Sequence, residues 1–110
     1  MSHWKNSITL FKHAISIANK KHPNLAIIHN NLGIALFDKQ KIEEAITQYK
    51  IAIKLNPNLT SAHYNLGVVL LQKGKIEEAI YYFREALKLQ PDFVAARDNL
   101  KISLLRLQEL

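Results

Sequence analysis

The sequence predicts an all-α protein in which pairs of antiparallel helices stack into a solenoid, and three observations lead there. Residues 26–59 and 60–93 match without a gap at a spacing of 34. Within each copy, apolar residues recur at helical spacing in two segments, and a proline follows the second segment. Hydrophobic residues make up 48% of the chain and charged residues 22%, as in folded domains. A fixed period of this length indicates stacked repeats.

The two copies share 16 identities over 34 positions, which chance does not produce. The longest shared block is Lys-Ile-Glu-Glu-Ala-Ile, at residues 41–46 and 75–80. The period also extends outward, because Pro23 precedes Pro57 by one repeat and Asn99 follows Asn65 by one repeat. We therefore predict about six helices in one domain over residues 1–110. Its parts are a half repeat of second-helix type over 1–22, full repeats over 26–59 and 60–93, and a C-terminal capping helix over 94–110.

Small and bulky residues recur at fixed places in the two copies. Gly33 and Gly67 are expected to let the partner helix approach closely. Tyr49 and Phe83 are expected to fill the core between neighbouring units rather than to form an aromatic binding box. Polar residues after the prolines are expected to cap the next helix, at Asn24, Asn58 and Asp92.

These positions together resemble the tetratricopeptide repeat signature. The matching residues are Asn-Leu-Gly at 31–33 and 65–67, Ala45 and Ala79, Tyr49 and Phe83, Ala52 and Ala86, and Pro57 and Pro91. The resemblance covers nearly the whole chain and implies a tetratricopeptide-type α-solenoid. His29 and His63 depart from it by replacing a frequent tryptophan. Lys101 replaces a small residue, which suggests that the last helix caps the stack.

The same resemblance implies that the first helix of each pair lines a concave groove that binds a peptide. The groove residues that it implies are Asn30, Asn31, Ile34, Phe37, Tyr64, Asn65, Val68, Leu71, Asp98, Asn99 and Ile102. Ile34, Val68 and Ile102 recur at the repeat spacing and would form an apolar stripe, which usually marks a binding surface. The alternative is that some of these residues only pad the inner wall.

Asn31, Asn65 and Asn99 form a second series at the repeat spacing. A carboxamide can both donate and accept, so these side chains could bind the backbone of an extended peptide, as in some family members. They could equally tie neighbouring helices together. The sequence leaves both readings open.

One specialised family activity is not expected. Family members that bind heat-shock chaperone tails hold the terminal carboxylate with lysines, asparagines and an arginine. The corresponding positions here are Asn30, Ile34, Asn65, Ala95 and Asn99, of which only Asn65 fits. Without the basic residues, such a carboxylate clamp is not predicted.

The sequence gives little support for a catalytic, cofactor-binding or metal-binding site. The chain has no cysteine, and no catalytic constellation, phosphate loop or cofactor motif is present. His29 and His63 could in principle bind a metal, but packing is the expected role, so no metal, no cofactor and no enzyme activity are predicted. No apolar run is long enough to cross a membrane, and no secretory signal is visible, so a cytoplasmic protein is expected.

The function predicted from the sequence is a protein-interaction scaffold that holds a peptide segment of a partner. Net charge is +6, but the lysines are scattered, so nucleic acid is the alternative rather than the expected partner. A further alternative is an arm of a larger enzyme. Head-to-tail self-association is a separate hypothesis, with Leu104, Leu105 and Leu107 of one chain on Trp4, Ile8 and Phe11 of the next.

Overall fold

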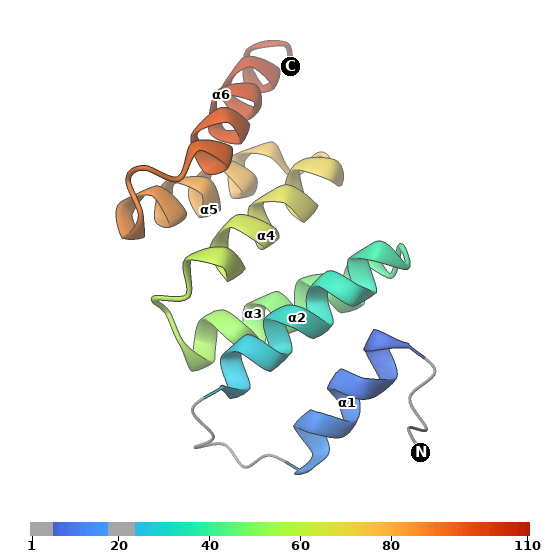
Figure 1. Cartoon of the computed structure of the whole chain (residues 1–110). Helices are drawn as coiled ribbons and strands as arrows, with labels where there is room; N and C mark the ends of the chain where they lie inside the picture. Colours follow the sequence, from blue (N-terminus) through green and yellow to red (C-terminus); the bar gives the residue numbers. More distant parts are fainter. Residues whose placement is uncertain (1–5, 18–23) are drawn as a thin grey trace. The chain divides into compact units, whose positions relative to one another are not determined.

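The computed structural model describes residues 6–17 and 24–110, where all regular structure is helical (Figure 1). The helices are α1 (Ser7–Ile17), α2 (Leu25–Asp38), α3 (Ile42–Leu55), α4 (Thr60–Gln72), α5 (Ile76–Leu89) and α6 (Val94–Gln108). The all-α prediction of about six helices is confirmed. Trp4 and Pro23 lie outside the described residues.

The chain forms two compact units, Met1–Leu59 and Thr60–Leu110, which divide at the predicted boundary between the repeats. In unit 1, α2 packs against α1 and α3. In unit 2, α5 packs against α4 and α6, and α4 also contacts α6. Each full repeat is therefore a packed helix pair within one unit. The single domain over residues 1–110 stays a prediction.

A glycine–aromatic contact closes each helix pair. A Cβ added at Gly33 would lie 2.5 Å from Cε1 of Tyr49, and one at Gly67 would lie 2.7 Å from Cε1 of Phe83. Both rings are almost fully buried, at 2% and 0% exposure. The predicted close approach is confirmed. Each ring packs against the glycine of its own repeat, and the expected packing between neighbouring units stays a prediction.

The first helix of each repeat ends in the same left-handed turn. Gln40 has φ 62° and Gly74 has φ 81°. After α2, the N–H of Lys41 donates to the carbonyl of Leu36 at 2.9 Å, and the N–H of Gln40 donates to that of Phe37 at 2.9 Å. The corresponding bonds follow α4, so both ends are Schellman motifs. This turn sends the chain back along the same helix pair.

Helix starts differ from the predicted caps. Asn24 precedes α2 but makes no side-chain capping bond there. The N-cap of α6 is Phe93 rather than Asp92. Asn56 acts in the turn between the repeats instead, where its Oδ1 accepts from the N–H of Asn58 at 3.1 Å. Sequence alone placed polar residues near each helix start but did not identify which groups they bond.

Candidate functional site

The predicted groove residues differ widely in exposure. Ile34, Asp98 and Ile102 are exposed, and Asn30 and Leu71 are buried, at 4% and 8%. The remaining six are half-buried, namely Asn31, Phe37, Tyr64, Asn65, Val68 and Asn99. Asn30 and Leu71 therefore differ from the prediction, because their side chains are not at the surface. The others remain accessible at least in part.

In unit 2, Tyr64 joins α4 to α6. Its hydroxyl accepts from Nδ2 of Asn99 at 3.1 Å, and the same nitrogen donates to the carbonyl of Ala95 at 3.1 Å. The Tyr64 ring lies 4.9 Å from that of Phe93 and 5.9 Å from that of Phe83. Asn99 thus ties two helices together, which is one of the two roles that the sequence left open.

Apolar side chains follow Tyr64 and Asn99 along their helices. One turn after Tyr64 is Val68 on α4, which is half-buried, and one turn after Asn99 is Ile102 on α6, which is exposed. Leu105 lies one turn beyond Ile102 and is 56% exposed. We call Val68, Ile102 and Leu105 the unit 2 strip. Asp98 is exposed one turn before Ile102, which adds a negative charge to this face.

In unit 1, a hollow lies between α1 and α2. It has a volume of about 170 Å³ and is lined by Ser7, Phe11, Asn31, Ile34, Ala35 and Asp38. A second hollow of about 210 Å³ adjoins it and shares Ser7, Ala35 and Asp38. We refer to the first as the unit 1 hollow. Two predicted groove residues, Asn31 and Ile34, therefore line a concave surface within this unit.

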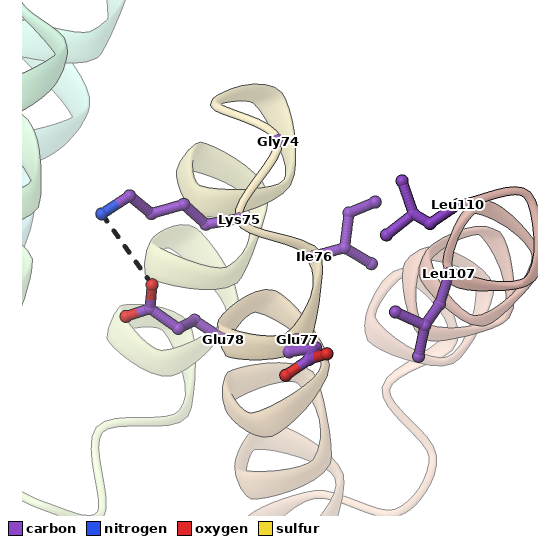
Figure 2. Close-up of a pocket in the computed structure, with 7 residues that line it drawn as sticks. All are labelled: Gly74, Lys75, Ile76, Glu77, Glu78, Leu107 and Leu110. Atoms are coloured by element: carbon purple, nitrogen blue, oxygen red, sulfur yellow. Dashed lines mark ion pairs between the residues drawn. The ribbon is translucent and has the colours of Figure 1, made fainter.

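The hollow of about 210 Å³ in unit 1 corresponds in position to a hollow in unit 2, which is shown in Figure 2. It has a volume of about 290 Å³ and lies between the start of α5 and the end of α6. Ile76, Leu107 and Leu110 point toward one another across it (Figure 2). Lys75 pairs with Glu78 at 3.9 Å beside it. Leu110 is 89% exposed, so this surface is shallow.

The two repeat histidines are packing residues. His29 is buried and its Nδ1 lies 2.6 Å from Oε1 of Gln48, which lies 19 positions later on α3. His63 is also buried, and its ring lies 6.0 Å from that of Tyr82, at the corresponding position on α5. Among residues 6–17 and 24–110, no cluster of three His, Asp or Glu side chains could hold a metal ion.

Two family models match the chain, one described as "TPR repeat" over residues 35–74 and one as "Tetratricopeptide repeat" over residues 60–93. The chain belongs to the tetratricopeptide repeat family. The predicted tetratricopeptide-type α-solenoid is thereby confirmed. No curated protein matches this tetratricopeptide repeat protein. Within the described part of the chain, no helix is long and apolar enough to cross a membrane.

Solved tetratricopeptide repeat structures share the fold. The first tetratricopeptide repeat domain of Spaghetti (RPAP3), bound to the HSP90 peptide SRMEEVD, is 22% identical with a TM-score of 0.85, over 92% of this chain and 77% of that one. The second such domain of human RPAP3, in complex with the HSP70 peptide SGPTIEEVD, is 26% identical with a TM-score of 0.78, over 87% and 77%. MamA is 25% identical with a TM-score of 0.79, over 87% of this chain and 54% of MamA.

Proposed function

We propose that this tetratricopeptide repeat protein is a protein-interaction scaffold that binds a peptide segment of a partner and catalyses no reaction. The observation that carries the proposal is the unit 2 strip, where Val68, Ile102 and Leu105 offer apolar surface on neighbouring helices. Exposed apolar surface of this kind typically serves protein recognition. Two solved relatives in the family hold short peptides, which supports the same use of this fold.

The polar residues of the same face suit a peptide rather than a small molecule. Asn65 is half-buried near Val68 on α4. Both hydrogen bonds of the Asn99 side chain to Tyr64 and Ala95 use Nδ2 as the donor, so its Oδ1 can accept a bond from a ligand. An amide oxygen can accept from a peptide N–H whatever the side chains of the ligand are. We therefore propose that apolar anchors of the partner lie on the unit 2 strip while its backbone bonds to side-chain amides.

The test compares a double variant with a matched control. Peptides are selected by phage display on the wild-type protein, and their affinities are measured by fluorescence anisotropy. Val68→Asp combined with Ile102→Asp is expected to weaken binding at least tenfold, because a carboxylate would replace each apolar contact. Tyr81→Asp is the control, since Tyr81 is 56% exposed on α5.

Tyr64 is left unchanged in this test because its ring and hydroxyl hold α4 to α6. Circular dichroism must show unchanged helix content for both variants. If the double variant binds the selected peptides as the wild type does, the proposed surface is wrong. Steeply salt-dependent binding of single-stranded RNA would instead support the nucleic-acid alternative.

A further inference from the structure

The first helices of both full repeats carry no lysine or arginine. The chain has 15 of these residues against 9 acidic ones, yet none of the 15 lies on α2 or α4. Asp38 is the only Asp, Glu, Lys or Arg of α2, and α4 has none. The lysines and arginines of unit 2 lie on α5, on α6 and in the turn after α4. A basic chain therefore keeps the α4 part of the unit 2 strip free of positive charge.

Two cations of α6, Arg97 and Lys101, point away from α4. The α4 side of this helix is marked by Asn99, whose Nδ2 donates to the hydroxyl of Tyr64 at 3.1 Å. Arg97 and Lys101 each lie two positions from Asn99, which is a rotation of about 200° around the helix, and both are exposed. They therefore lie on the opposite side of α6 from the surface that α4 and α6 share.

Asp98 places a negative charge at the Tyr64 end of the unit 2 strip. It is exposed one turn before Ile102, and in the described part of the chain its carboxylate forms no hydrogen bond or ion pair. The half-buried ring of Tyr64, which Asn99 holds, adds apolar surface at this end. We propose that the bound peptide places a lysine or arginine at Asp98 and an apolar residue on Val68 and Ile102. This inference rests on the proposed function and adds the chemistry of the ligand.

The spacing of Asp98 and Ile102 fixes the spacing in the ligand. The two residues are four positions apart on α6, which corresponds to about 6 Å along the helix. Side chains two positions apart in an extended peptide lie on one face at about 7 Å. We therefore expect the cation two positions from the apolar anchor, on either side of it.

A basic side chain suits this place better than an acidic or a purely apolar one. Its aliphatic stem can lie on Ile102 while its charged head reaches the carboxylate of Asp98 through water-exposed space. Asp92 is exposed just before α6 and adds negative charge at the same end of this helix. At the other end of α6, Arg106 and Glu109 have opposite signs, so they give no net preference. The partner is thus a peptide with a basic residue beside its apolar anchor.

The test starts from peptides selected by phage display on the wild-type protein and first asks which of them occupy the strip. Val68→Asn with Ile102→Asn should weaken such peptides about tenfold or more, because amides replace apolar contacts. Asparagine is used because aspartate at these positions would itself attract a basic peptide. If no selected peptide is sensitive to this double variant, the proposed function and the ligand chemistry are both wrong.

Peptides that are sensitive to the double variant are expected to carry lysine or arginine two positions from an apolar residue. Changing that cation to glutamine should weaken binding to wild type about threefold or more at low salt, and much less to Asp98→Asn. Asp98→Glu should keep the dependence on the cation, because the carboxylate is retained. The preference should shrink at about 0.5 M salt, where exposed charges are screened.

Glu44→Gln is the matched control, because it removes an exposed carboxylate on α3 and should leave the preference for the cation unchanged. Circular dichroism must show the same helix content for all variants. An equal effect of the glutamine change on wild type and on Asp98→Asn would overturn the assignment of the cation to Asp98. Strip-binding peptides that lack a basic residue would overturn it as well, and both results would leave the proposed function standing.

Discussion

The ring of Phe83 lies so close to the backbone of Gly67 that a methyl group there would come within 2.7 Å of Cε1. Phe83 is 0% exposed, so its ring lies inside the core rather than at the surface, where it could move aside freely. Gly67→Ala is therefore expected to lower the free energy of unfolding by roughly 1–3 kcal/mol, because overpacking outweighs the better helix propensity of alanine. Urea unfolding followed by circular dichroism measures this change.

A compensating change identifies the cause of that loss. Phe83→Leu shortens the side chain opposite residue 67, so Gly67→Ala should cost less in the Phe83→Leu background than in wild type. Gly33→Ala is expected to behave as Gly67→Ala does, since its Cβ would lie 2.5 Å from Cε1 of Tyr49. A stability gain from either single alanine would show that the helix pairs can separate without strain.

The turn after α2 contains a residue that the backbone does not favour. Gln40 has φ 62°, whereas the equivalent Gly74 has φ 81° without a steric penalty. Gln40→Gly is therefore expected to raise the free energy of unfolding by about 1 kcal/mol. Gly74→Gln is expected to lower it by about the same amount, although no atom of the described residues beyond the chain neighbours lies within 4 Å of a Cβ at residue 74. Thermal unfolding of both variants tests this pair of opposite effects.

Alkaline pH is expected to destabilise the fold through Tyr49. Burial, and secondarily the charge of Asp38, raises the pKa of the Tyr49 hydroxyl. In the unfolded chain this hydroxyl loses its proton near pH 10, while in the folded state it keeps the proton at higher pH. The folded state then binds more protons, so its stability falls as the pH rises above about 10.

Tyr49→Phe should remove that part of the loss, and phenylalanine already occupies the equivalent position 83. Urea unfolding at about pH 9 and about pH 11 is expected to show a smaller decrease for Tyr49→Phe than for wild type. Some decrease should remain, because burial chiefly, and then Tyr81 and Glu78, raise the pKa of Tyr82. Equal decreases in both proteins would exclude Tyr49 as the source.

The hydrogen bond between Tyr64 and Asn99 should contribute modestly to stability. Tyr64→Phe removes the hydroxyl but leaves Nδ2 of Asn99 bonded to the carbonyl of Ala95. The expected loss in the free energy of unfolding is therefore about 0.5–1.5 kcal/mol. Combining it with Asn99→Ala should cost less than the sum of the two single changes. Strict additivity would mean that the two side chains do not interact in solution.

The chaperone peptides held by related structures are expected not to bind here. Ile34 and Ala95 stand at two clamp positions without a polar group, and Asn30 at a third is buried. The exposed carboxylate of Asp98 would also repel an acidic peptide. Isothermal titration with SRMEEVD is expected to give no measurable heat at about 100 μM peptide, a concentration well above that of a specific micromolar site. Saturable binding of SRMEEVD would contradict this expectation and would indicate that the protein has a carboxylate clamp.

Much of the fold could be predicted because the residues that determine helix packing occur at the same positions in both repeats. The spacing of Gly33 to Tyr49 equals that of Gly67 to Phe83, so a shared packing role followed from the sequence. The prolines that follow the second segment of each copy, Pro57 and Pro91, likewise lie just beyond the ends of α3 and α5. Features that both copies share could thus be predicted from the sequence.

Burial and hydrogen-bond partners that differ between the copies could not be predicted from the sequence. Periodicity places Asn30 and Leu71 on a face but does not say how deeply neighbouring side chains cover them. It likewise could not show that Asn99 bonds to Tyr64, since the partner of an amide depends on the distance between two helices. The unit 1 hollow could not be predicted either, because its shape depends on how α1 packs against α2.

The histidine contacts have a consequence for how two similar copies assemble within one chain. His29 meets an amide on α3, whereas His63 meets an aromatic ring on α5. Because both first helices offer the same imidazole, an α2–α5 mispair would still place a histidine against Tyr82, as the native α4–α5 pair does. These contacts therefore give the chain no protection against shuffled folding intermediates, and the choice of the correct pair depends on chain connectivity and on residues that differ between the copies.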